Sequence, residues 1–452
     1  MDVLQIFNFI NSFEKEKKIN LLETTTNKEF EVLLKKNNTG LSFRLPHPFF
    51  NLLYKKDAVF KLSSELITLD IVNFLVKNEQ HSLMSRVCEA YMFQTLNFNS
   101  KEEKYYSYYS KINSFFLLNF FEEYQQDLSV YIRGLKFKIS TCIINNKKKV
   151  DLLCIQCENK LDFKKFKHYV NNIIVSIGFF SGEFYKKEEF FFQSTVKDFS
   201  INTDLFYRSS NLEFSFPEPF TYSPNSWSWK FKNEYELDSF QKKEFSSRIS
   251  KKSFLELVEL LIRYPRIYFS IRMVFSFYNF SVLSRVSMLF VVLEVICEEF
   301  KNDLDTNYIQ KELKYKLGQK LLEKYKESIA AEDFIILDDI IENIDKRLTN
   351  NIVNYEQVFD ALNINLSNED RFVLKKRNHF FHGRIIPKSI QIDSEEAYVN
   401  LEKNYFHDSL RLYVLVSKLI LKKVKFSGYI INYPKLFEEE NILRESYFVK
   451  LN

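Results

Sequence analysis

Residues 368–383 read Asn-Glu-Asp-Arg-Phe-Val-Leu-Lys-Lys-Arg-Asn-His-Phe-Phe-His-Gly, a segment that contains signals for both the start and the end of one helix. Asn368, followed by two acids, is typical of a helix N-terminus, where such side chains satisfy free backbone N–H groups. Gly383 is one of only seven glycines, and a glycine just past the last turn commonly ends a helix. Its apolar residues can face a core: Phe372, Val373 and Phe380. The segment therefore predicts a helix over 368–382.

Three polar residues near the end of this helix have the types and spacing of a nuclease site. Asn378 and His382 are four residues apart and share a helix face, which the long side chain of Arg377 can also reach. An imidazole can move protons in both directions near neutral pH, and a guanidinium can clamp a phosphate. The last helical turn also favours the imidazolium form of His382. A second interpretation stays open, in which His382 is a buried or capping histidine among surface charges.

The flank of the segment is basic. Between Arg371 and Lys388 there is no acid, whereas there are six basic residues: Arg371, Lys375, Lys376, Arg377, Arg384 and Lys388. Such a cluster can hold a polyanion even though the net charge of the chain is only +5. We expect RNA contacts from Lys375, Lys376 and Arg384. His379 is an auxiliary candidate that would assist His382 or stack on RNA, unless it lies on another helix face.

Long amphipathic helices are expected around this segment. Apolar residues recur at helical spacing over 253–263, 282–300, 308–328, 333–348, 355–362 and 394–424. Residues 282–300 are apolar on most faces, as expected for the central helix of a bundle. Three prolines within 216–226 interrupt regular structure and indicate a domain junction between there and about residue 252. The sequence predicts an all-α helical bundle over 253–425 and a C-terminal extension over 426–452.

Residues 1–240 have a different pattern and are expected to form a mixed α+β domain. Segments 128–144 and 150–157 are rich in β-branched residues with alternating character, which indicates strands. Residues 162–177 have helical spacing and end near Gly178 and Gly182, and an aromatic strand is expected over 189–195. The order strand, strand, helix, strand leaves the topology open.

Composition limits the class of protein. The chain has 452 residues, of which 46% are hydrophobic, enough for two or three domains with large cores. Scarce glycine excludes a glycine-rich phosphate loop, and neither His-Glu-x-x-His nor Gly-x-Ser-x-Gly occurs. Five scattered cysteines do not resemble a disulfide scaffold, and Cys154-x-x-Cys157 has no partner pair for a zinc site. With no signal peptide or long apolar segment, a cytoplasmic protein without a membrane partner is expected.

At residues 377–383, Arg-Asn-His-Phe-Phe-His-Gly resembles the Arg-x4-6-His signature of HEPN domains, in its Arg-Asn-x-x-x-His form. The apolar segment 282–300, with Leu293-Glu294 embedded in it, resembles the first conserved helix of such domains. The resemblance covers about residues 253–425. Residues 176–185, which precede an expected strand, resemble the N-terminal part of ApeA-like HEPN proteins.

The resemblance implies a four- or five-helix bundle that forms a homodimer, with Arg and His from each protomer in a shared cleft. Many HEPN proteins are metal-independent endoribonucleases of bacterial antiviral defence or toxin systems. The RNA 2′-OH attacks the adjacent phosphate and leaves a 2′,3′-cyclic phosphate and a 5′-OH. Carried over by position, Arg377 and His382 are the catalytic pair, Asn378 supports them, and Glu294 is auxiliary. No metal and no cofactor is implied.

Two further functions stay open. A non-catalytic HEPN module would bind RNA or a partner protein, with the basic helix holding phosphates without chemistry. In a sensor, the domain at 1–240 would recognise a phage-derived or small-molecule trigger. The sensor is compatible with the ribonuclease, because a toxic nuclease that acts by abortive infection needs restraint.

Overall fold

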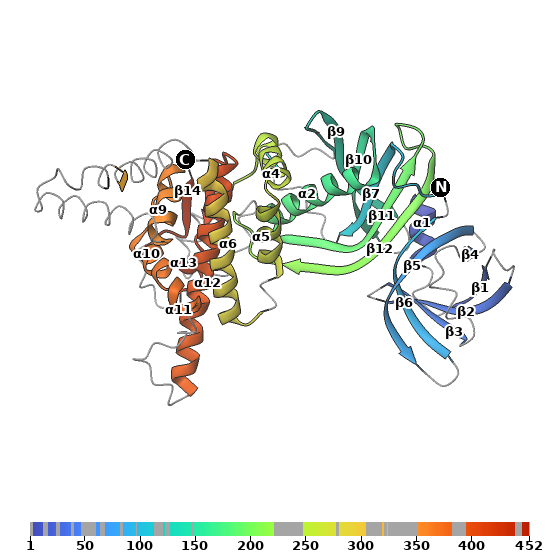
Figure 1. Ribbon diagram of the computed structural model, residues 1–452, viewed down its shortest axis with the longest axis horizontal. Coiled ribbons are helices and arrows are strands. Elements are labelled where there is room, and N and C mark those ends of the chain that lie inside the picture. The colour runs from blue at the N-terminus through green and yellow to red at the C-terminus, as the bar shows by residue number, and fades with distance from the viewer. Residues whose placement is uncertain are drawn as a thin grey trace, which may run out of the picture. The chain divides into compact units, whose positions relative to one another are not determined.

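The computed structural model describes most of the chain. The residues described are 3–11, 17–23, 28–37, 40–46, 60–63, 68–81, 85–95, 97–112, 121–122, 127–145, 149–220, 247–276, 280–303, 319–320, 323, 351–381, 395–438 and 445–451. They belong to two compact units, residues 1–215 and 216–452. Antiparallel strands dominate the first unit and helices the second (Figure 1). The expected order, a mixed α+β part followed by a helical part, is confirmed.

Six strands of the first unit form a closed ring. They are β1 (Lys17–Glu23), β2 (Lys28–Asn37), β3 (Gly40–Pro46), β4 (Phe60–Ser63), β5 (Thr68–His81) and β6 (Ser85–Thr95). Their order is β3-β2-β1-β4-β5-β6, and antiparallel pairing of β3 with β6 joins the two ends. The helix α1 (Val3–Asn11) belongs to the same unit, and its buried Ile6, Phe7 and Ile10 recur at helical spacing.

The strand β6 also belongs to a second, open sheet. Along one edge β6 pairs with β5, whereas its other edge pairs with β3 through residues 85–90 and with β12 (Asn202–Ser215) through residues 92–94. The open sheet continues in the order β12-β11-β7-β10-β9-β8. Its other strands are β11 (Glu183–Ser194), β7 (Lys104–Ile112), β10 (Lys149–Leu161), β9 (Leu135–Asn145) and β8 (Asp127–Ile132). One strand is therefore common to the ring and to the open sheet.

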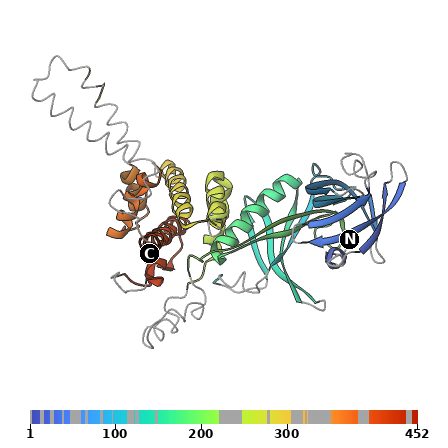
Figure 2. The same cartoon turned by 90° about the horizontal axis from the view of Figure 1, so that it is seen from below.

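The helix α2 (Phe163–Ser181) lies along one face of the open sheet (Figure 2). Phe163 and Phe166 contact the rings of Tyr106 on β7 and Phe191 on β11. The Asp162 side chain caps the helix by accepting a hydrogen bond from the Lys165 backbone N–H at 2.8 Å. Gly182 ends the helix with a φ of 71°, in the left-handed region that favours glycine. The predicted helix at 162–177, with its stop at Gly182, is confirmed, as are the strands predicted over 128–144, 150–157 and 189–195.

The second unit is built around two long helices that lie side by side, α6 (Val282–Asp303) and α12 (Glu395–Lys423) (Figure 1). The helices α4 (Lys251–Arg263), α5 (Pro265–Ser276), α9 (Asn351–Ala361), α10 (Asn368–Lys375) and α11 (Arg377–Phe381) complete this set. Helices are confirmed at 253–263, 282–300, 355–362 and 394–424, whereas 308–328 and 333–348 fall almost entirely outside the described residues. None of the helices that the structure describes is long and apolar enough to cross a bilayer.

Over 253–425 the described residues contain helices and no strand, as predicted. In the expected C-terminal extension, β13 (Gly428–Ile431) and β14 (Phe448–Leu451) pair antiparallel, with α13 (Tyr433–Leu436) between them in the chain.

Two predictions for this unit are wrong in detail. The single helix predicted over 368–382 is broken at Lys376, whose N–H bonds to the carbonyl of Val373, three residues back instead of four. Phe372 does not face the core but is 61% exposed. Lys376 Nζ lies over its ring, 4.6 Å from the centroid.

Candidate functional site

Arg377 is the first residue of α11, and partners from two helices hold its guanidinium. Its Nε and Nη2 contact Oε1 of Glu294 on α6. Its Nη1 donates to Oδ1 of Asn378 at 2.9 Å, and the guanidinium carbon lies 4.9 Å from the centroid of the Phe381 ring. The Arg377 side chain is only 19% exposed. One of the predicted catalytic residues is therefore held in a defined orientation against α6.

Glu294 connects three helices through its carboxylate. Besides Arg377 of α11, it accepts a hydrogen bond from the hydroxyl of Tyr355 on α9 at 3.2 Å. Burial raises the pKa of Tyr355, and the charge of Glu294 raises it further, so the hydroxyl stays protonated and remains a donor. Local spacing gives no sign of this contact, because Glu294 and Arg377 are 83 residues apart.

The remaining residues named from the sequence are described to different extents. Asn378 is exposed and lies beside Arg377. His382 and Arg384 lie outside the described residues, as does the side chain of His379. The structure thus brings together Arg377, Asn378 and Glu294, and of the expected catalytic pair it describes only Arg377.

Acids from distant helices neutralise part of the basic flank. Nζ of Lys376 contacts both carboxylate oxygens of Asp408 on α12, at 2.8 and 3.0 Å. Nε of Arg371 contacts Oε1 of Glu356 on α9 at 2.9 Å. Lys375 is exposed. Because two of these cations are paired, the positive potential around α10 and α11 is weaker than the local sequence indicates.

The ion pair between Lys376 and Asp408 links the helix break at Lys376, which separates α10 from α11, to the helix α12. Asp408 is 5% exposed, and burial raises the pKa of its carboxyl although Lys376 and Arg411 favour the charged form. A buried carboxylate of this kind is costly without a cation. The ammonium of Lys376 supplies that cation at the residue directly before Arg377.

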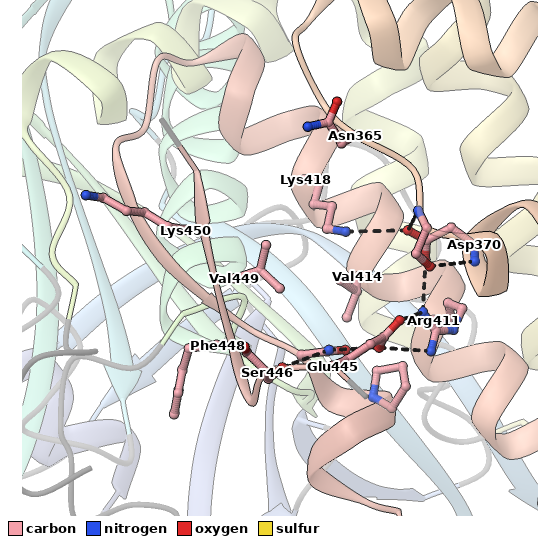
Figure 3. A pocket seen from close by; sticks show the side chains of 13 residues that line it. Asn365, Asp370, Arg411, Val414, Lys418, Glu445, Ser446, Phe448, Val449 and Lys450 are labelled. Carbon is pink, nitrogen blue, oxygen red and sulfur yellow. Dashed lines mark hydrogen bonds and ion pairs between the residues drawn. The ribbon is translucent and has the colours of Figure 1, made fainter. Parts of the chain in front are cut away.

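A second charged cluster involves α10 and α12 (Figure 3). Arg411 is 7% exposed, and its Nη1 donates to Oδ1 of Asp370 at 3.1 Å. The same guanidinium makes a two-pronged contact with Glu445, Nη1 to Oε1 at 3.0 Å and Nη2 to Oε2 at 3.1 Å. Asn432 donates to Glu445 at 3.0 Å. Asp370 also completes a capping box with Ser367 at the start of α10.

This cluster lines a cavity of about 380 Å³. Lys418 of α12 lines it as well and points toward Asp370 (Figure 3), with Nζ 3.7 Å from Oδ2 of that residue. The cavity is not among the features predicted from the sequence, yet one signal for it exists. Arg411 and Lys418 are seven residues apart within the largely apolar run 410–421, so two charges lie on one face of a helix that is otherwise suited to a core.

The Cys154-x-x-Cys157 pair lies on β10 and is not arranged for metal or redox chemistry. Residues three apart on a strand point to opposite faces. Both cysteines are buried, and burial raises the pKa of Cys154 to about 12 and that of Cys157 to about 11, so neither is a reactive thiolate. Within the part of the chain that the structure describes, no three His, Cys, Asp or Glu side chains gather as metal ligands would.

Comparison with known proteins gives no relative: no family model, no curated protein and no solved structure matches the chain.

Proposed function

We propose that this protein is a metal-independent endoribonuclease of the HEPN type, in which Arg377 and His382 act on the scissile phosphate of RNA. The observation that carries the proposal is the held guanidinium of Arg377, which contacts Glu294 and Asn378 at the start of a short helix. An arginine with fixed orientation can present its donors to a phosphate without first ordering its own flexible side chain.

The remaining donors of Arg377 suit this role. A guanidinium has five N–H groups, and three of them face Glu294 and Asn378. The other two, one on Nη1 and one on Nη2, have no acceptor among the described residues. In the proposed reaction they contact phosphate oxygens and stabilise the charge that develops when the 2′-OH attacks. His382 then transfers a proton, from the 2′-OH or to the leaving 5′-oxygen.

The proposal includes an assembly and a trigger. Two copies of the chain, paired through their helical units, would place two Arg377 and His382 pairs at one cleft. The first unit would sense a phage-derived or small-molecule signal and release the nuclease, so that RNA cleavage stops growth of the infected cell. These parts rest on the sequence resemblance.

A second candidate function is a non-catalytic module that binds a protein partner. The pairing of Arg371 with Glu356 and of Lys376 with Asp408 leaves less free positive charge for RNA than the sequence indicates. On the same helix pair, Phe372 is 61% and Phe381 41% exposed, and exposed aromatic rings are common in protein interfaces.

The test compares the wild type with Arg377→Ala and His382→Ala in RNA cleavage, with analysis of the 3′ ends. We expect wild-type product with a 2′,3′-cyclic phosphate, formed in the presence of EDTA, and a loss on the order of 10²–10⁴-fold in each variant. Arg285→Ala is the matched control, because this arginine lies in the first turn of α6 and bonds to the Phe280 carbonyl.

Full activity in both active-site variants would remove the ribonuclease proposal. Salt-sensitive RNA binding without a cyclic phosphate product would favour the non-catalytic module instead. A strict need for a divalent cation would contradict the proposed mechanism even if RNA were cleaved.

A further inference from the structure

We propose that the cavity between α10, α12 and β14 binds the phosphate group of a small phosphate ester, with Lys418 as its anchor. This site is separate from the chemistry proposed for Arg377 and does not depend on it. The cavity is lined by α10 and the residues before it, by α12, and by the segments at 432–434 and 445–450.

The surroundings of Lys418 indicate that its ammonium binds a ligand. Its side chain is 9% exposed, and its only ion contact among the described residues is with Asp370 at 3.7 Å, beyond hydrogen-bond distance. None of its three N–H donors is hydrogen-bonded to that part of the chain. The side chain is thus nine-tenths buried, and its ammonium has unused donors with which it can hold an anion. Because Lys418 lines the cavity, an anion there would supply the missing acceptors (Figure 3).

The two carboxylates of the cavity are already engaged and do not take that role. Glu445 accepts hydrogen bonds from Nη1 and Nη2 of Arg411 and from the side-chain amide of Asn432. Asp370 accepts hydrogen bonds from Nη1 of Arg411 and, at 3.0 Å, from the backbone N–H of Ser367. Arg411 balances one of these two negative charges and Lys418 the other, but Arg411 makes the hydrogen bonds, so the ammonium of Lys418 keeps its donors for a ligand.

The same arrangement favours phosphate over carboxylate. A planar carboxylate is best matched by the fork of a guanidinium, and the fork of Arg411 is filled by Glu445. A lysine acts on phosphate as a point charge, and a tetrahedral anion can accept hydrogen bonds from several directions. Ser367 and Ser446, which line the cavity on separate segments, add hydroxyl groups that can donate.

The volume indicates an ester instead of the free ion. At about 380 Å³ the cavity lies within the range of roughly 300–1,000 Å³ that is typical of small-molecule sites. Apolar side chains form part of its wall, namely Val414, Pro434, Phe448 and Val449. A phosphate near Lys418 would leave room for a small organic group against these residues.

The experiment uses the full chain in phosphate-free buffer at about 0.15 M salt, where long-range charge effects are screened. Calorimetric titrations compare inorganic phosphate, glycerol 3-phosphate and succinate, a dicarboxylate of similar size. We expect saturable binding of both phosphates, tighter for glycerol 3-phosphate, and little binding of succinate. Lys418→Met keeps most of the side-chain volume and removes the charge, and it should weaken both phosphates by about tenfold or more.

Two further variants make the result decisive. Lys403→Met removes an exposed lysine from the same helix, outside the cavity lining, and should bind as the wild type does. Ser446→Ala removes a hydroxyl from an exposed residue that lines the cavity, so the fold should tolerate it, and it should also weaken binding. If Lys418→Met does not fold, Ser446→Ala takes its place.

Three outcomes would overturn the proposal. The first is the absence of saturable phosphate binding by the wild type. The second is equal affinity in the wild type, in Lys418→Met and in Ser446→Ala. The third is binding of succinate as tight as that of glycerol 3-phosphate, which would reject phosphate as the ligand class.

Discussion

Arg411 and Arg266 each contact two carboxylates, but at very different depths. Arg411 is 8% exposed at its side chain and contacts Asp370 and Glu445, whereas Arg266 is 54% exposed and contacts Glu298 and Glu299. Arg411→Ala removes the cation that hydrogen-bonds to the buried Asp370 and the partly buried Glu445, and we expect a loss of about 3–5 kcal/mol in the free energy of unfolding. Arg266→Ala should cost about 1 kcal/mol or less, because the Arg266 side chain is itself half exposed to water.

Urea denaturation of both variants measures this difference. Equal and small losses would mean that water already solvates Asp370 and Glu445 in the folded protein. Equal and large losses would mean that the Arg266 pairs are less accessible to water than their exposure indicates.

For single residues, a contact can be predicted from the sequence only when its two residues lie close together in the chain. Arg377 and Asn378 are neighbours, and their types and position on a helix identify them as candidates. The partners of Arg411 are 41 and 34 residues away, and only folding brings them together. The same holds for the acids that pair with Arg371 and Lys376. A run of bases without nearby acids therefore predicts a more positive surface than the structure has.

Among the elements, α2 has termini that can be tested one atom at a time. Asp162→Ala removes the side-chain acceptor for the Lys165 N–H and should lower the free energy of unfolding by about 1 kcal/mol. Asp162→Asn keeps an acceptor and is the matched control, with a smaller expected loss. If Asp162→Asn lowered the free energy of unfolding as much as Asp162→Ala does, the charge of Asp162, and not its role as a hydrogen-bond acceptor, would stabilise the helix.

The Asp162 cap should also depend on pH. Burial opposes ionisation, but hydrogen bonds from Lys165 and the charge of Lys165 outweigh it, so the pKa of Asp162 lies below its ordinary value of 3.8. A carboxyl whose pKa falls on folding stabilises the protein above the ordinary value, and this contribution is lost as the pH falls through the lower, folded value. The difference between wild type and Asp162→Ala should therefore shrink below pH 3.8, as unfolding curves at several pH values would show.

Elements with clear periodicity could be predicted, and others could not. The helices α4, α6, α9 and α12 and the helix α2 follow from apolar spacing and caps. The strand β5 has register irregularities between Val72 and Glu79, which disturb the alternation that would identify it. The strands β13 and β14 have four residues each, too few for a period. The break at Lys376 is a tertiary effect, since its side chain is held by Asp408 on another helix.

On the scale of the whole molecule, the second compact unit begins at Phe216 and should fold as a fragment from there. The ring of Phe216 stacks on Phe275 with centroids 4.5 Å apart, and the hydroxyl of buried Tyr433 donates to the Glu218 carbonyl at 2.6 Å. The hydroxyl of Tyr413 donates to the Pro217 carbonyl.

We therefore expect a fragment of residues 216–452 to unfold cooperatively and to be more stable than a fragment of residues 241–452. The shorter fragment leaves two buried tyrosine hydroxyls without acceptors, which costs about 1–3 kcal/mol for each such group. Thermal unfolding followed by circular dichroism compares the two. Equal stability would show that residues 216–220 contribute little to this core.

The shared strand β6 has a consequence for how the protein is made. As the nascent chain leaves the ribosome, residues 85–95 can join β3 and β5 at once, because both strands have already been synthesised. The β12 partners of residues 92–94 are encoded more than 110 residues later. At about 5–20 residues per second, synthesis of that interval takes on the order of ten seconds. For that time part of one edge of β6 has no neighbour, and such an edge can recruit a wrong strand or a chaperone.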